Sequence, residues 1–157
     1  MSEREYNNCV DELSHRVYGY LYKILKHKET VEDLVQDSFL TLWQQRQNVH
    51  IDKAKSFLFV TAHNLMINNI KYSILRSTPT QMEDVYQDNS FENKNLVNYL
   101  VEQLNKNMKE CLLLRDLEGF SYKEIASIVN LTEENVKVNI FRARVKLKQM
   151  LNEIEKQ

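Results

Sequence analysis

The sequence predicts an all-α protein made of two small helical bundles joined by a flexible linker. The chain has 157 residues but only two glycines and one proline, so few positions interrupt a helix. Apolar residues recur at helical spacing over most of the chain, and a longer polar segment around Pro79 interrupts the pattern. We therefore expect a domain at 1–76, a linker at 77–91 and a second domain at 92–157.

Composition is typical of a globular protein, with 43% hydrophobic and 27% charged residues. No apolar run reaches the length of a bilayer span, and the first residues lack the basic-then-apolar order of a signal peptide. We expect no membrane insertion and a cytoplasmic location. Cys9 and Cys111 form no C-x-x-C pair, so we expect two small buried thiols instead of a disulfide or a zinc site.

Three helices are expected in the first domain. An apolar stripe from Val10 to Ile24 predicts a helix over about 4–27. Thr30 is expected to cap a second helix that ends near Trp43, and the segment 44–51 has no helical period and indicates a loop. Asp52 is then expected to cap a third helix over 53–75.

The second domain is expected to hold four helices, of which the last two form a helix-turn-helix. Ser121 and Glu124 fit a capping box, so a helix should begin at Tyr122. Asn130 tolerates the left-handed backbone of a tight exit, and Thr132 can cap the next helix. Two earlier helices are expected around Leu96 to Leu104 and Met108 to Leu117, the latter closing near Gly119. With the helix-turn-helix they make a domain of four helices.

The last helix carries a basic face. Val136, Ile140, Ala143 and Leu147 recur at helical spacing and should face the core. The polar side chains that this spacing turns outward, and that we expect to bind DNA, are Lys137, Asn139, Arg142, Arg144, Lys146 and Lys148. The alternative is a solvated helix whose cations complement the helix dipole. A charge run alone, however, would not predict the two caps and the short turn before it.

Overall charge is close to neutral, which is unusual for a nucleic-acid-binding protein. The formal net charge is −1, and residues 81–119 hold eight acidic against four basic side chains. A local basic helix on a nearly neutral protein should bind DNA weakly by itself. We therefore expect a larger partner to supply affinity.

The order of motifs resembles that of bacterial extracytoplasmic-function (ECF) RNA polymerase sigma factors. The segments that carry the resemblance are DLVQDSFLTLW at 33–43, SFLFVTAHNL at 56–65, and FSYKEIASIVNLTEENVK followed by FRARVKL at 120–147. The resemblance covers nearly the whole chain. It implies a factor that binds core RNA polymerase, directs it to promoter DNA and helps to open the minus-ten element.

The resemblance also assigns residues in the first domain. The helix at 30–43 would bind the clamp helices of the largest polymerase subunit through Asp33, Gln36 and Asp37, although the same side chains also suit a solvated face. The residues that would contact the minus-ten element are Asn48, His50, Lys53, Lys55, His63, Asn64, Asn68 and Lys71. Many relatives carry arginine where this chain has His63, so unaided melting should be weak.

In the second domain the resemblance assigns the basic helix to the minus-thirty-five element. Val138 stands where relatives commonly have a small polar residue, and it either touches a thymine methyl or packs inward. Regulation by an anti-sigma protein is a further implication of the family.

Rival functions fit less well. The sequence lacks a glycine-rich phosphate loop, H-E-x-x-H and ligand-spaced histidines, so we expect no enzyme, no catalytic residues, no metal and no cofactor. A stand-alone helix-turn-helix regulator of duplex operator DNA remains the alternative, and it predicts tight binding without polymerase. A pure interaction module would leave the outward cations without a role.

Overall fold

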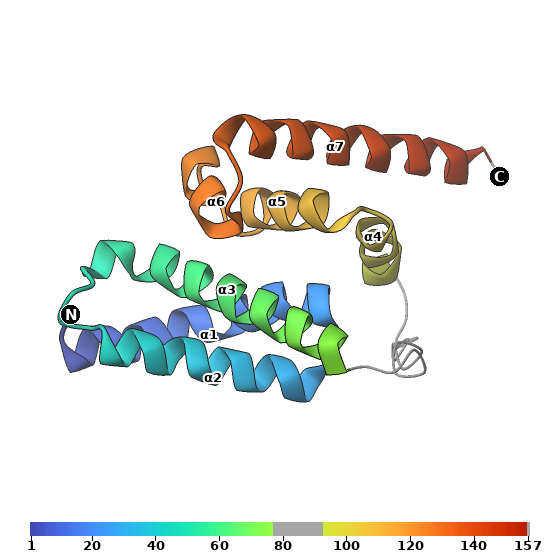
Figure 1. Ribbon diagram of the computed structural model, residues 1–157. Helices are drawn as coiled ribbons and strands as arrows, with labels where there is room; N and C mark the ends of the chain where they lie inside the picture. Colours follow the sequence, from blue (N-terminus) through green and yellow to red (C-terminus); the bar gives the residue numbers. More distant parts are fainter. Residues whose placement is uncertain (77–92, 157) are drawn as a thin grey trace. The chain divides into compact units, whose positions relative to one another are not determined.

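The computed structural model describes residues 1–76 and 93–156, and within these ranges it contains helices and turns but no strand (Figure 1). The all-α prediction is confirmed. The chain divides into two compact units, Met1–Tyr86 and Gln87–Gln157. The segment predicted to be a linker, 77–91, lies outside the described residues. No helix in the described ranges is both long and apolar enough to cross a membrane.

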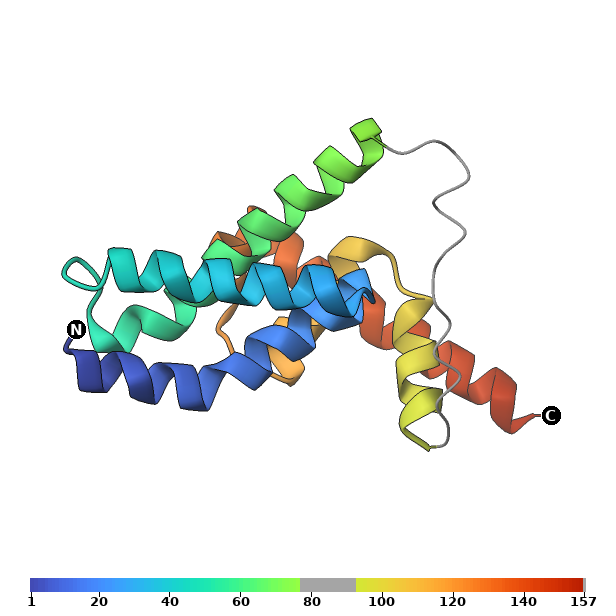
Figure 2. The ribbon, with the colours of Figure 1, turned by 90° about the horizontal axis from the view of Figure 1, so that it is seen from below.

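Unit 1 is a bundle of three helices in which each helix packs on the other two. Its elements are α1 (Glu3–Leu25), α2 (Lys28–Gln44), a short 3-10 helix η1 (Ile51–Lys53) and α3 (Ala54–Arg76). α1 and α2 run antiparallel, and α3 returns along them (Figures 1 and 2). Leu21, Leu42 and Leu58 are fully buried where the three helices meet. These residues come from the predicted apolar stripes, so burial of the stripes explains the bundle.

One predicted cap in unit 1 is wrong. α2 is capped by His27, whose Nδ1 accepts a hydrogen bond from the Thr30 amide at 3.2 Å, and Thr30 lies in the first turn. His50 likewise accepts from the Asp52 amide at 3.2 Å and caps η1, the short helix that contains Asp52 and precedes α3. An imidazole nitrogen is a hydrogen-bond acceptor that replaces the expected hydroxyl at the start of α2.

In its described part, unit 2 is a bundle of four helices centred on α5 and α7. Its helices are α4 (Asn93–Glu102), α5 (Lys106–Asp116), α6 (Tyr122–Val129) and α7 (Glu133–Glu155). α5 packs against both α6 and α7. Leu104, Met108 and Leu112 form a buried cluster with Ala143, and Leu147 packs against its edge. This cluster joins α7 to α5 and so fixes the last helix on the rest of the unit.

The turn between α6 and α7 agrees with the sequence prediction at every cap. Ser121 Oγ accepts from the Glu124 amide, and the Glu124 carboxylate accepts from the Ser121 amide, both at 3.1 Å. Asn130 has a φ of 57° and ends α6. Thr132 Oγ1 accepts from the Asn135 amide at 3.1 Å and starts α7. A helix-turn-helix with a three-residue connection is therefore present.

Both cysteines are buried and free, as predicted. Cys111 lies inside α5, where burial raises the pKa of its thiol to about 12, with the neighbouring Glu110 contributing in the same direction. The thiol is therefore neutral at physiological pH. Because the unfolded chain would ionise this group near its ordinary value of 9.0, the contribution of Cys111 to stability is present below that pH and declines above it.

We expect Ser121→Ala to lower the free energy of unfolding by about 1 kcal/mol, because the substitution removes one half of the capping box. Urea denaturation followed by circular dichroism measures the change. Ser127→Ala is the matched control, since its Oγ donates only a 3.4 Å hydrogen bond to the Lys123 carbonyl in the middle of the same helix. Equal losses from both variants would contradict the assigned cap.

Candidate nucleic-acid interface

The rotation of α7 about its own axis is fixed by three buried side chains. Val136, Ile140 and Ala143 are at most 2% exposed and lie on one side of the helix. α7 packs with that side against α5 and α6. The predicted inward stripe is confirmed, and the opposite side of α7 faces solvent.

The five predicted cations are exposed, and they are Lys137, Arg142, Arg144, Lys146 and Lys148. Asn139 differs from the prediction in part. It is half-buried, and its Nδ2 donates to the carbonyl of Asn135 at 2.8 Å. Its amide group is therefore turned along its own helix, which leaves the cations as the main polar feature of the outer face.

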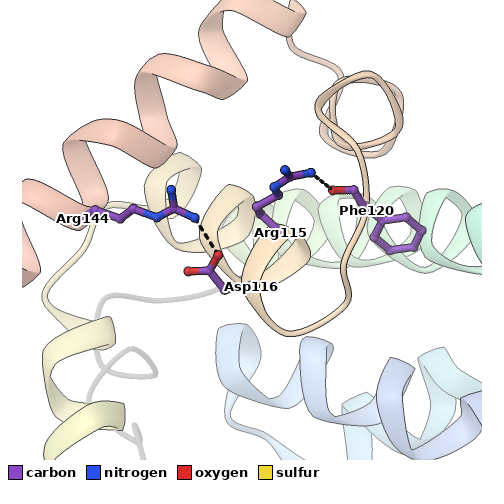
Figure 3. A network of polar contacts seen from close by, with 4 residues as sticks. All are labelled: Arg115, Asp116, Phe120 and Arg144. Atoms are coloured by element: carbon purple, nitrogen blue, oxygen red, sulfur yellow. Dashed lines mark hydrogen bonds and ion pairs between the residues drawn. The ribbon is translucent and has the colours of Figure 1, made fainter.

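Two of these cations are held by other parts of unit 2. Arg144 Nη2 donates to Asp116 Oδ1 at 2.8 Å (Figure 3), and Lys146 Nζ donates to the carbonyl of Gln103 at 2.7 Å. The Asp116 and Arg144 side chains are 46% and 53% exposed. An ion pair this exposed adds about 0–1 kcal/mol to stability. The Arg142 side chain, by contrast, makes no hydrogen bond or ion pair with any residue in the described ranges.

Arg115, the residue before Asp116, joins α5 to the start of α6. Its Nη1 donates to the Phe120 carbonyl at 2.9 Å (Figure 3), and its guanidinium lies 4.4 Å from the centre of the Tyr122 ring. Lys137 Nζ lies 5.5 Å from the same ring. Tyr122 therefore links α5, α6 and the first turns of α7 through two cation–π contacts.

An apolar strip on the outer face of α7 was missed by the sequence analysis. Phe141 is 69% exposed, with Val138 at 42% and Val145 at 39%. Val138 thus faces outward, which settles the question that the sequence left open. The spacing of these residues, opposite the inward stripe, is a signal that identifies the strip from sequence. Apolar side chains on a basic helix suit contact with thymine methyl groups in a major groove.

The predicted polymerase-binding residues lie on the exposed side of α2. Asp33, Gln36 and Asp37 are all exposed. Leu40 is 53% exposed and follows Gln36 and Asp37 by one turn, so it lies on the same side of the helix. An exposed leucine therefore stands beside two carboxylates on this side of α2.

The loop between α2 and η1 presents Asn48 and His50 but buries Val49. Asn48 Nδ2 donates to Gln45 Oε1 at 3.3 Å. The base of the loop is held by Arg46, whose guanidinium lies 3.8 Å from the centre of the Trp43 ring and donates to the Trp43 carbonyl at 2.8 Å. Two polar side chains therefore project from an anchored loop.

The residues in and before α3 that are predicted to contact DNA differ in their exposure to solvent. Asn64, Asn68 and Lys71 are exposed and repeat at helical spacing, and Lys53 before the helix is also exposed. Lys55 is half-buried. Each of these four exposed side chains is accessible to a nucleic-acid strand.

The prediction that His63 lies on an outward face is wrong. His63 is 4% exposed. It follows the buried Phe59 by one turn and precedes the buried Met66 by three residues, so helical geometry places it on their side of α3. The imidazole is therefore not positioned to contact DNA in this structure.

Comparison with known families identifies the chain. The family described as "Sigma-70 region 2" matches residues 9–73, and "Sigma-70, region 4" matches residues 94–147. The first match spans most of unit 1, and the second spans α4 to the middle of α7. The chain belongs to the sigma-70 family of RNA polymerase sigma factors, as a member of the ECF group that directs the polymerase to promoters. The stand-alone regulator is not favoured, since both regions are matched in this order.

Individual relatives agree with the family. SigM, an ECF RNA polymerase sigma factor of Bacillus subtilis (strain 168), is 29% identical over 144 residues, which cover 87% of this chain and 88% of SigM. YlaC, an RNA polymerase sigma factor of the same organism, is 25% identical over 161 residues and is covered to 92%, as is this chain.

Solved structures share the fold. The sigma factor RpoE of Bartonella quintana, solved in complex with the anti-sigma factor NepR, has a TM-score of 0.70 and 20% identity over 95% of this chain and 98% of RpoE. CnrH, solved with the cytosolic domain of CnrY, has a TM-score of 0.69 and 21% identity over 96% of this chain and 90% of CnrH. At these identities the likeness shows the fold alone.

We expect Arg142→Ala to weaken binding of the upstream element by about 1–3 kcal/mol, because an exposed arginine on the outer face of α7 can pair with a base edge. Binding is measured with holoenzyme on a promoter obtained by selection from random DNA. Arg4→Ala, which removes the same charge from an exposed position on α1, is the control. If both variants lost affinity for the promoter equally, or if Arg142→Ala also lost polymerase binding, α7 would not be the helix that contacts the bases of the upstream element.

Proposed function

We propose that this ECF sigma factor binds core RNA polymerase through α2, holds the opened minus-ten strand along α3, and reads the minus-thirty-five element with α7. One observation carries this division of roles. A single chain presents an acidic and apolar face on one helix of unit 1 and a basic and apolar face on one helix of unit 2. The acidic face suits a partner with a basic surface, and the basic face suits an acidic partner such as DNA.

The α2 face suits a basic protein surface. Asp33 and Asp37 lie one turn apart and would meet cations of the clamp helices of the largest polymerase subunit. Leu40 would occupy the apolar part of the same interface, where exclusion of water strengthens nearby charge pairs. Charges at the rim of an interface chiefly raise the association rate, and Leu40, once it is buried in the complex, would slow dissociation.

The α3 surface suits a single strand that has already been opened. Melting without ATP requires unpaired bases to be held better than paired ones, by stacking, hydrogen bonds and phosphate contacts. Asn48 and His50 project from the loop, and Asn64, Asn68 and Lys71 continue along α3. Few of these side chains are cationic and His63 is buried, so the polymerase must supply much of the strand-holding energy.

The α7 surface suits duplex DNA. Arg142 would read a base edge, Phe141 and Val138 would contact thymine methyls, and Lys137 and Lys148 would bind phosphates. Arg144 would contribute only after giving up Asp116, whereas Lys146 keeps its charge beside the Gln103 carbonyl.

Regulation by an anti-sigma protein is part of the proposal. The RpoE relative was solved with the anti-sigma factor NepR. A protein of this kind that covers the α2 face would prevent polymerase binding.

Because chromosomal DNA and RNA polymerase are the proposed partners of this sigma factor, we place it in the cytoplasm, and we assign it no covalent chemistry.

We expect core RNA polymerase plus this protein to give a start-site-specific product in run-off transcription on promoters from its own genome. Core enzyme alone should give none. Failure to direct initiation at any such promoter would count decisively against the proposed function.

A pair of double variants locates the polymerase-binding face in the same assay. Asp33→Asn with Asp37→Asn should raise the factor concentration needed for half-maximal product roughly tenfold, since two charge contacts are lost. Asp11→Asn with Glu12→Gln removes the same charge from exposed positions on α1 and should have little effect. The reverse ranking would place the interface on α1.

A further inference from the structure

An acidic side chain is paired with one of the five outward cations of α7. Asp116 ends α5 and lies 28 positions before Arg144, and its Oδ1 is 2.8 Å from Arg144 Nη2 (Figure 3). The two side chains are 46% and 53% exposed, so the pair stands at the surface of unit 2. A carboxylate thus neutralises part of the surface that the proposed function gives to DNA.

We propose that Asp116 is an internal substitute for a DNA phosphate, which occupies Arg144 in the free protein and lowers the affinity of unit 2 for any duplex. This inference rests on the proposed function of α7. Binding to DNA would exchange the carboxylate for a phosphate, so that Arg144 remains paired before and after. The gain from the exchange is then smaller than the gain from an arginine that begins unpaired.

The geometry of the pair suits an exchange. The contact between Arg144 and Asp116 runs through a single nitrogen and a single oxygen, whereas the strongest arginine–carboxylate pairs are bidentate. Solvent reaches both side chains, so the ion pair is weak. When a phosphate replaces the Asp116 carboxylate, the carboxylate stays in contact with water and is not left buried without a partner.

Other contacts hold the helix-turn-helix in shape, so Asp116 is not needed for that purpose. Val136, Ile140 and Ala143 anchor α7 in the core. Arg115 connects α5 to the start of α6 through the Phe120 carbonyl and the Tyr122 ring. The Asp116–Arg144 pair adds an exposed contact to an arrangement that buried residues already determine.

Lys146 offers an instructive contrast on the same helix. Its Nζ donates to the Gln103 carbonyl, which is a neutral acceptor. The carbonyl orients Lys146 but does not cancel its charge. Asp116 both orients and neutralises Arg144, and this is why we assign the masking role to Asp116.

The test uses the full-length chain and a labelled duplex of mixed sequence, because phosphate contacts do not depend on sequence. Asp116→Asn should tighten binding at low salt by roughly twofold to fivefold. The slope of log affinity against log salt should change by much less than one unit, because Arg144 contacts a phosphate in both complexes. Glu153→Gln, at an exposed position near the end of α7, makes the same charge change and should leave the affinity nearly unaltered.

A double variant separates masking of Arg144 from a general effect of charge. Asp116→Asn should bring no gain in a chain that already carries Arg144→Ala. A full gain in that background would overturn the inference, as would weaker binding or loss of helical circular dichroism in Asp116→Asn itself. Run-off transcription is an independent readout. If it succeeds while Asp116→Asn leaves duplex affinity unchanged, this inference fails and the proposed function stands.

Discussion

Burial of one side of α7 is the constraint on which the rest of unit 2 depends. Val136, Ile140 and Ala143 are inserted against α5 and α6, and a helix held by residues spaced three and four apart cannot rotate without exposing them. Phe141 and Arg142 are therefore presented to solvent by a rigid scaffold. The buried side chains therefore give the basic surface of α7 a defined geometry.

The sequence predicted the local features of the fold best. The capping box at Ser121, the left-handed Asn130 and the Thr132 cap involve residues at most four apart, so the pattern contains the interaction itself. The predicted cap at Thr30 was wrong because the imidazole of His27, three residues earlier, accepts the hydrogen bond from the Thr30 amide. The prediction for His63 was wrong, even though helical spacing places this residue on the same side of α3 as the buried Phe59 and Met66.

The candidate site was predictable in its charges but not in their pairing. The five cations of α7 follow from the inward stripe, and Phe141 could have been found by the same reasoning. The contact between Arg144 and Asp116 joins residues from two helices, and no local pattern encodes it. Asp116 belongs to the acidic excess of residues 81–119, and the structure brings part of that excess to the basic surface.

Site-specific photo-crosslinking tests the central claim, that the outer side of α7 meets upstream duplex DNA while α3 meets the downstream strand. A photoreactive residue is placed at Val138 or at Asn68, both exposed, and the factor is assembled with core polymerase on a selected promoter. We expect position 138 to crosslink near the minus-thirty-five element and position 68 near the minus-ten element. Crosslinks from both positions to one element, or from 138 only to protein, would contradict the claim.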